Sequence, residues 1–192
     1  MAVRVHEDGL ARCGWLNDDP LYVSYHDTEW GNPLAGDNAM FERLSLEGFQ
    51  AGLSWLTILK SREGFLSAFA GFEIARVAEF GAADVARLLV DEGIIRHRGK
   101  IEATVNNARI ALELEGGLER FVLGFKPTEN RRGLTKSPES EALSKALRKL
   151  GFNFVGPTTM HALMQATGMI NDHDVDCFKN HSKPVRLRLT ET

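Results

Sequence analysis

Hydrophobic residues recur at helical spacing along most of the chain, and no alternating strand pattern of useful length interrupts them. In segment 37–52, for example, Met40, Leu44, Glu47 and Ala51 fall on one helical face. The same periodicity predicts one or two helices in segment 53–69 and further helices in segments 82–93, 97–117, 137–151 and 156–168. These patterns predict an all-α fold.

Capping residues indicate where several of these helices begin and end. Asp37 is suited to the N-cap of the first helix, and Ser137 to the N-cap of a helix that Pro138 opens. Glycine favours the residue that follows a helix, so we expect Gly93 and Gly151 to end two of them.

The composition fits a soluble globular protein. Hydrophobic residues make up 43% and charged residues 26%, and 192 residues suit one domain spanning residues 1–192, in which the polar stretch 125–140 forms a loop. No apolar run is long enough to cross a membrane, and the first residues lack the apolar centre of a secretory signal. We therefore expect a cytoplasmic protein with no membrane partner.

The net charge of -3 argues against a strongly basic nucleic-acid coat, although it leaves room for a local basic face. Such a face has three candidate clusters: Arg96, Arg98 and Lys100; Lys145, Arg148 and Lys149; and Arg186 and Arg188.

Two histidines and the only two cysteines form a candidate metal site. His173 and Cys177 have H-x-x-x-C spacing, which places both on one side if residues 171–177 form a helical turn. Structural zinc requires four ligands, and Cys13 and His26 would complete a Cys2His2 set that ties the two ends of the chain together. Alternatively, each cysteine is a small buried hydrophobe and each histidine a surface or hydrogen-bonded residue. A disulfide is not expected in a cytosolic protein.

The segment from Gly151 to Gly156 joins two predicted helices. A glycine-bounded turn of this kind can present backbone N–H groups to a phosphate, with help from the dipole of the following helix. A tight turn between two core helices has the same sequence features.

Glu47 lies on the apolar face of its predicted helix, where a carboxylate is costly unless it is paired or used. It is either a structural acid with a buried partner or part of a site. Tyr22, Tyr25 and Trp55 are aromatic residues that would either form the walls of a pocket around it or pack in the core.

Taken together, these segments resemble the bacterial DNA-3-methyladenine glycosylases of the constitutive, type I class. The matching segments follow the order of the family: CGW from Cys13, DPLYVSYHDTEWG (19–31), LEGFQAGLSW (46–55), GIIRHRGKI (93–101) and GFNFVGPTTMHALMQATGMINDHDVDC (151–177). One departure is His161, Ala162 and Leu163, where the family carries an aromatic-serine-aromatic run.

The resemblance implies a helix-hairpin-helix glycosylase fold with one structural Zn2+. The family's ligands match Cys13, His26, His173 and Cys177, so the metal would tie segment 11–31 to segment 171–180. Four protein ligands leave no open position, so the implied zinc positions the chain and does no catalysis.

The resemblance also implies a pocket for the damaged base, formed by Tyr22, Tyr25, Glu47 and Trp55. Methylation at N3 makes adenine cationic within DNA, and a cationic ring stacks well between aromatic faces. Glu47 would accept from the exocyclic amine and favour the positive ring, which makes it the candidate catalytic residue. We expect Trp30 to lie in the core.

The implied activity is excision of 3-methyladenine from double-stranded DNA by a monomer. The hairpin would contact DNA through Gly151, Phe154, Gly156 and Thr158, and Leu53 is the candidate to fill the gap left by the extruded base. The family lacks the usual catalytic aspartate, so no general base is assigned among Asp172, Asp174 and Asp176. No lysine nucleophile is evident in the pocket segments, so no strand-cleaving lyase step is expected. The alternative is a catalytically inactive, zinc-stapled module that binds DNA lesions.

Overall fold

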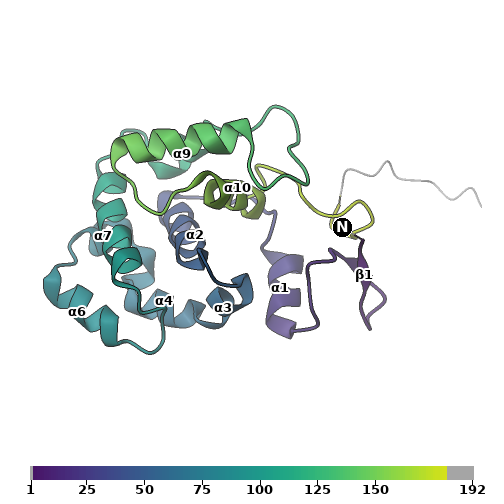
Figure 1. The fold of residues 1–192 in the computed structure, drawn as a ribbon, viewed down its shortest axis with the longest axis horizontal. Coiled ribbons are helices and arrows are strands. Elements are labelled where there is room, and N and C mark those ends of the chain that lie inside the picture. Colours follow the sequence, from purple (N-terminus) through teal and green to yellow (C-terminus); the bar gives the residue numbers. More distant parts are fainter. Residues whose placement is uncertain (1, 181–192) are drawn as a thin grey trace, which may run out of the picture.

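The computed structural model describes residues 2–180. Within that range the chain forms ten α-helices, one 3-10 helix and a two-stranded antiparallel hairpin (Figure 1). In chain order the elements are β1 (Arg4–Val5), β2 (Ala11–Arg12), α1 (Pro20–Thr28), α2 (Asp37–Gln50), α3 (Trp55–Lys60), α4 (Arg62–Ala68), η1 (Ala70–Phe72), α5 (Ile74–Ala78), α6 (Ala82–Val90), α7 (Arg98–Leu112), α8 (Leu118–Leu123), α9 (Pro138–Leu150) and α10 (Pro157–Ala166). The predicted helical fold is confirmed for these residues. The strands of two residues are too short for an alternating pattern to reveal them.

Helix α2 lies at the centre of the helical body and contacts α3, α7, α8 and α10 (Figure 1). Its buried side chains include Met40, Phe41, Leu44 and Phe49, each at most 1% exposed. Burial of one such side chain contributes about 1.5–3 kcal/mol, whereas a helix cap contributes about 1 kcal/mol. Packing therefore dominates the placement of α2, which carries Glu47 on a face that is closed by other helices.

Helix α9 begins and ends where the sequence predicts. The side chain of Ser137 accepts from the N–H of Ser140, and Pro138 is the first helical residue. Gly151 follows the helix with a φ of 100°, a left-handed conformation that glycine adopts without steric cost.

Two predicted helix boundaries are wrong. Gly36 is the N-cap of α2, and Asp37 is its first residue, whose carboxylate accepts from the N–H of Glu119 at 2.8 Å. Helix α6 ends at Val90 rather than Gly93. Gly93 instead packs against α4, where a Cβ atom on Gly64 would lie 2.1 Å from the Gly93 carbonyl oxygen.

The loop predicted at 125–140 is shorter than expected. Helix α8 ends at Leu123 and α9 already begins at Pro138, so residues 138–140 are helical. None of the helices in residues 2–180 is both long enough and apolar enough to cross a membrane.

The two terminal segments meet beside α1, away from the main helical body (Figure 1). The N–H of Phe178 donates to the carbonyl oxygen of Ala11 at 2.8 Å. Cys13, Leu16 and Cys177 form a small hydrophobic cluster separate from the main core. This contact brings segment 171–180 next to the start of the chain.

Candidate active site and metal centre

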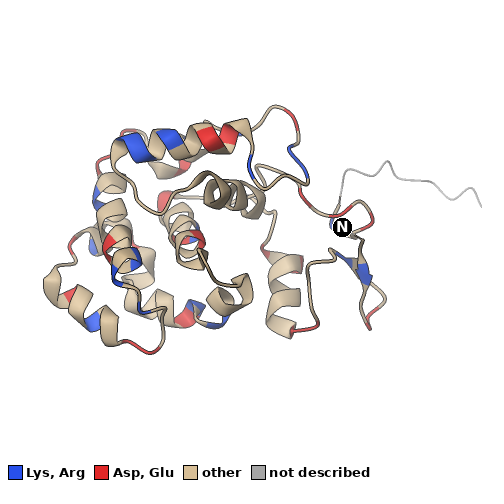
Figure 2. Ribbon diagram, viewed as in Figure 1, with Lys and Arg blue, Asp and Glu red and all other residues tan. Residues whose placement is uncertain are grey.

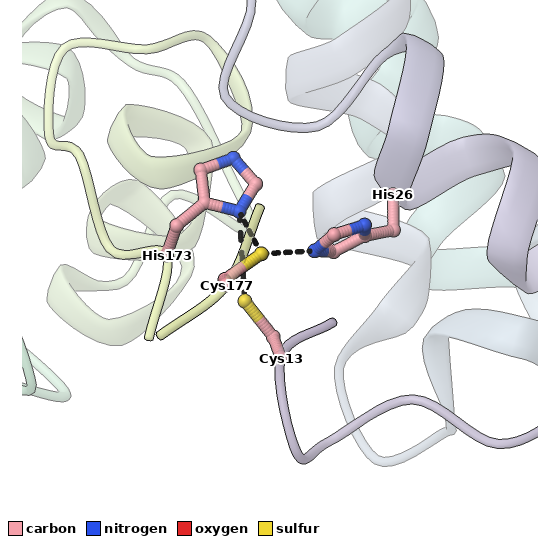
Figure 3. A group of neighbouring side chains, drawn as sticks. All are labelled: Cys13, His26, His173 and Cys177. Atoms are coloured by element: carbon pink, nitrogen blue, oxygen red, sulfur yellow. Dashed lines mark hydrogen bonds between the residues drawn. The ribbon is translucent and has the colours of Figure 1, made fainter. Parts of the chain in front are cut away.

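Cys13, His26, His173 and Cys177 converge in this terminal region, and all four are buried (Figure 3). The Sγ atom of Cys177 lies 3.4 Å from Nε2 of His26 and 3.7 Å from Nδ1 of His173. The Sγ atom of Cys13 lies 3.5 Å from the same Nδ1 atom, and the four candidate ligand atoms are all within 4.8 Å of one another.

These distances fit a tetrahedral zinc ion. Zinc bonds of about 2.3 Å to sulfur and 2.0–2.1 Å to nitrogen, at tetrahedral angles, separate a sulfur ligand from a nitrogen ligand by about 3.5 Å. The four side chains predicted from the sequence are therefore brought together in a geometry that could hold a metal ion.

The surroundings of His26 orient its ring toward this cluster. Its Nδ1 atom lies 2.7 Å from Oδ1 of Asp27, which leaves Nε2 facing Cys177. Burial acts to raise the pKa of Asp27, but hydrogen bonds from Arg12 and His26 outweigh it and lower that pKa below its usual value. Asp27 is therefore ionised, and Arg12, itself bonded to Asp8, holds it in place. A carboxylate behind a histidine is a frequent arrangement at zinc sites.

Backbone groups hold the other two ligands. Residues 171–177 do not form a helical turn, the condition under which the sequence spacing would place both ligands on one side. Instead a tight turn, closed by the Cys177 N–H and the Asp174 carbonyl oxygen at 2.9 Å, places His173 and Cys177 side by side. The N–H of Asp174 also donates to Sγ of Cys13 at 3.3 Å. Burial raises the pKa of the Cys13 thiol, a cost that a bound cation would offset by favouring the thiolate.

A cavity of about 270 Å3 opens next to this region. Its volume lies just below the range of about 300–1,000 Å3 of small-molecule sites, which suits a small planar ligand. The cavity is lined by side chains from α1, α2, α3, α10 and both terminal segments: Trp15, Tyr22, Tyr25, Trp30, Glu47, Gln50, Trp55, Ala162, Gln165 and Asp172. All four residues predicted for the pocket are among them.

Glu47 is a buried acid in the wall of this cavity. Its side chain is buried, and burial raises its pKa to about 8, while the positive charge of Arg43 acts in the opposite direction. In the free protein at neutral pH the carboxyl group is therefore mainly protonated. A cation that enters the cavity would favour the ionised form, because an opposite charge lowers the pKa of a carboxyl group.

Aromatic rings form much of the wall around Glu47. The rings of Tyr25 and Trp55 lie 5.4 Å apart at 45°, and the rings of Tyr22 and Trp15 lie 5.1 Å apart at 54°. Burial raises the pKa of both tyrosines, so both are neutral at physiological pH. The indole N–H of Trp55 is buried with no partner among the described residues, which leaves one donor available in the wall.

The sequence did not reveal several lining residues. Trp15 follows the CG pair of the first matching segment, which was the available signal, and Trp30 lines the cavity as well as packing against the core. Asp172, next to His173, accepts from Gln165 Nε2 at 2.6 Å and from the N–H of Gly133 at 2.6 Å. In the departure at 161–163, Ala162 lines the cavity, whereas the other two side chains are buried.

The predicted hairpin joins α9 to α10 and is held by α7. The side chain of Asn107 donates to the carbonyl oxygen of Asn153 at 3.0 Å and accepts from its N–H at 2.9 Å. Phe154, at the tip, is 40% exposed and has a φ of 57°, which is uncommon for a residue other than glycine. Gly156 is the N-cap of α10 without a side-chain cap, and Thr158 lies in its first turn.

The turn that carries Leu53 follows the end of α2, where Gly48 packs against Phe154 of this hairpin. Lys100, at the start of α7, donates to the carbonyl oxygens of Phe49 and Ala51 at 2.8 and 2.6 Å and so fixes the end of α2. Lys100 and Phe154 line one narrow crevice. Leu53 follows this fixed end and is 40% exposed.

Charge is distributed unevenly along α9 (Figure 2). Acidic residues occupy the first turn, and Arg148 and Lys149 occupy the last turn, next to the hairpin. The predicted basic cluster at 145–149 thus lies beside the hairpin. Two other predicted basic residues, Arg186 and Arg188, lie outside the described residues.

Comparison with known proteins gives a consistent result. The family model for methyladenine glycosylases matches residues 15–180. DNA-3-methyladenine glycosylase 1 of Escherichia coli strain K12 is 46% identical over 179 residues, which cover 88% of this chain and 96% of that protein. The DNA-3-methyladenine glycosylase of Haemophilus influenzae is 43% identical over 177 residues, covering 86% and 96%.

Solved structures show the same similarity. A crystal structure of 3-methyladenine DNA glycosylase I (TAG) matches with a TM-score of 0.84 and 45% identity, covering 88% of this chain and 98% of the other. A Staphylococcus aureus TAG structure that addresses 3-methyladenine recognition matches with a TM-score of 0.81 and 37% identity, covering 86% and 94%. Because the family model and both relatives span most of the sequence, the chain belongs to the methyladenine glycosylase family.

Proposed function

We propose that this protein is a DNA repair N-glycosylase that extrudes 3-methyladenine from alkylated double-stranded DNA and hydrolyses its N-glycosidic bond. The observation that carries the proposal is the position of Glu47, a buried acid in a cavity walled by aromatic rings. The relatives named for 3-methyladenine, at 43–46% identity, support the choice of substrate.

The cavity would select the damaged base by charge. Tyr22, Tyr25 and Trp55 offer ring faces for stacking, and cationic rings are attracted to such faces. Glu47, ionised by the arriving cation, would accept from the exocyclic amine. Neutral adenine would bring no charge that favours the ionised form, so Glu47 would stay protonated, and an ionised Glu47 would be buried without a ligand cation, which is costly.

The reaction needs little covalent assistance because the base departs as a neutral molecule. Water would attack C1′ of the sugar as the bond to N9 breaks, the bonding electrons would move into the cationic ring, and the proton of the attacking water would pass to solvent. Glu47 is the candidate catalytic residue because its carboxylate would hold the extruded cationic base in place while the bond to N9 breaks.

The product would be an intact strand with an abasic site. No lysine lines the cavity in the part of the chain that the structure describes. Lys100 directs its ammonium group to two backbone carbonyl oxygens at the end of α2. A covalent imine with the sugar, which a lyase step requires, is therefore not expected.

DNA binding would use the hairpin face. Backbone N–H groups near Gly151, Gly156 and Thr158 are suited to phosphate contacts, because the uncapped start of α10 favours an anion. Exposed Phe154 and Leu53 would meet the duplex, with Leu53 as the candidate to fill the space of the extruded base. We expect a monomer on the DNA.

One Zn2+ per chain would be held by Cys13, His26, His173 and Cys177, as the sulfur–nitrogen distances support. When bound, the ion would supply a structural link between the terminal segments. The ligand His26 follows Tyr25 of the cavity, and the ligand His173 follows Asp172 of the cavity. The metal would therefore hold two parts of the cavity wall in place.

Release of free base from methylated duplex DNA tests the proposal. Chromatography should show 3-methyladenine with the wild-type protein and much less with Glu47→Gln. Unmethylated duplex should yield no adenine. DNA binding without base release would instead indicate an inactive lesion-binding module.

A further inference from the structure

A buried cation lies directly behind the aromatic wall of the cavity. Arg43, in α2, is 3% exposed, and its guanidinium carbon lies 5.3 Å from the ring centre of Tyr25 and 5.8 Å from that of Trp55. Arg43 itself does not line the cavity. We propose that Arg43 is a positioning residue of the base cavity, which holds Tyr25 against Trp55 and supplies a positive charge one helical turn from Glu47.

The first role follows from a hydrogen bond. Nη1 of Arg43 donates to the phenol oxygen of Tyr25 at 2.8 Å, and both side chains are buried. A hydrogen bond from a charged donor is stronger than one between neutral groups. Because Tyr25 comes from α1 and Arg43 from α2, this bond fixes the separation of the two helices at the cavity wall.

The guanidinium is in turn held from its other side. Nη2 of Arg43 lies 3.3 Å from Oε2 of Glu29, and Nη1 of Arg62 lies 2.6 Å from the same oxygen. Arg62 also donates to Glu42 at 2.9 Å. This network extends from α1 through α2 to α4, so Arg43 has one defined position and is compensated by a carboxylate.

The second role concerns the charge on Glu47. Arg43 and Glu47 are four positions apart in α2, a spacing that places them on the same helical face. The positive charge of Arg43 lowers the pKa of Glu47 and so opposes the larger effect of burial. Other groups face Glu47 across the cavity: Tyr25 from α1, Trp55 from α3, Gln165 from α10 and the carboxylate of Asp172. Asp172 is the other acid that lines the cavity, and none of the variants below changes it.

This inference rests on the proposed function, and a set of variants tests it separately. The readouts are affinity for free 3-methyladenine, measured by tryptophan fluorescence, and the pH dependence of kcat/KM for base release. Arg43→Met should weaken binding about tenfold, the scale of one charge-assisted hydrogen bond. Tyr25→Phe should weaken binding by a smaller factor, because it removes the same bond but keeps the charge of Arg43, and the double variant should be no weaker than Arg43→Met alone.

The pH dependence separates positioning from simple loss of stability. Arg43→Met should move the midpoint of kcat/KM to higher pH, since Glu47 loses the charge that favours its ionised form. Tyr25→Phe should leave the midpoint near that of the wild type. Arg43→Lys should keep the midpoint but bind the base less tightly, because lysine retains the charge and lacks the planar fork. Arg87→Met is the matched control: this arginine in α6 lies over the ring of Phe80 and bonds neither Tyr25 nor Glu29, so the affinity and midpoint of this variant should equal those of the wild type.

Unchanged affinity and an unchanged midpoint in Arg43→Met would overturn the inference, even if its melting temperature falls. If that variant does not fold, Arg43→Lys and Tyr25→Phe decide: equal affinities to wild type in both would overturn it. Full base release by Glu47→Gln is a different outcome, since it would overturn the proposed function itself.

Discussion

Tyr25 and His26 are neighbours in α1 but belong to different sites. The ring of Tyr25 lies against Trp55 in the wall of the cavity, whereas Nε2 of His26 lies 3.4 Å from Sγ of Cys177 in the Cys/His cluster. Successive residues in a helix point about 100° apart, so one turn of α1 serves both sites. Any displacement of His26 is therefore expected to reach the cavity wall.

Removal of the proposed zinc ion should destabilise the protein. A ligand that binds only the folded state at a free concentration 1,000-fold above its Kd contributes about 4 kcal/mol to the free energy of unfolding. Cys177→Ser, or zinc chelation of the wild type, should lower Tm by several degrees in thermal unfolding followed by circular dichroism. Val175→Ala, an exposed neighbour between two ligands, is the control and should leave Tm unchanged. Equal Tm values with and without zinc would count against a structural metal.

Asp27→Asn should weaken zinc binding about 10- to 100-fold, the usual effect of losing a carboxylate that orients a metal-binding histidine. The reason is the 2.7 Å contact between Oδ1 of Asp27 and Nδ1 of His26, which turns the opposite ring nitrogen, Nε2, toward the cluster. Competition with a chromophoric chelator measures the affinity. An affinity equal to that of the wild type would show that Cys177 and His173 orient the site without Asp27.

The sequence allowed good prediction of those features that local chemistry determines. Ser137, Pro138 and Gly151 define the ends of α9, because a cap needs only a few neighbouring residues. Asp37 failed as a cap because a distant partner, the N–H of Glu119, takes its carboxylate. Tertiary contacts of this kind are invisible in a local pattern.

The site residues likewise divide into those that the sequence could indicate and those that only tertiary contacts define. The four candidate ligands and the four pocket residues could be proposed from their chemistry and spacing, with alternatives left open, and the resemblance to a family whose motifs include them then favoured the two sites. Trp15 and Asp172 line the cavity but were not assigned to it, since only folding brings the terminal segments to α2. The role of Arg43 could not be predicted for the same reason, because its partners are distant in sequence. Tyr25 lies in α1, and Glu29 is the residue directly after that helix.

The stability of the protein should fall as pH rises through the range set by Glu47. Its pKa is about 8 in the folded protein and 4.5 when exposed, so between these values the unfolded chain has lost a proton that the folded protein retains. The contribution of Glu47 to the free energy of unfolding should then fall by about 1.4 kcal/mol per pH unit. Glu47→Gln should lack this decline and be more stable than the wild type by about 3 kcal/mol at pH 7.

Urea unfolding at several pH values measures the difference. Glu102→Gln, an exposed acid in α7, is the control and should follow the wild type. Parallel pH dependence in wild type and Glu47→Gln would contradict a buried, protonated Glu47.

Asn107→Ala should release the hairpin. It removes two part-buried hydrogen bonds to the N–H and carbonyl groups of Asn153, each of which contributes about 0.5–1.5 kcal/mol. Binding to methylated duplex should weaken more than binding to free 3-methyladenine, because the cavity does not include Asn107. Fluorescence anisotropy and tryptophan fluorescence measure the two affinities. Asn106→Ala, which loses one exposed bond to Gly151, should have a smaller effect, and equal losses for both ligands would contradict a DNA-binding hairpin.

The most direct test is a crystal structure of the protein with 3-methyladenine bound. We predict that the base lies in the cavity between the rings of Tyr22, Tyr25 and Trp55, with its exocyclic amine at the Glu47 carboxylate. A base bound at another surface, or a cavity that holds unmodified adenine in the same pose and with equal affinity, would contradict the proposal.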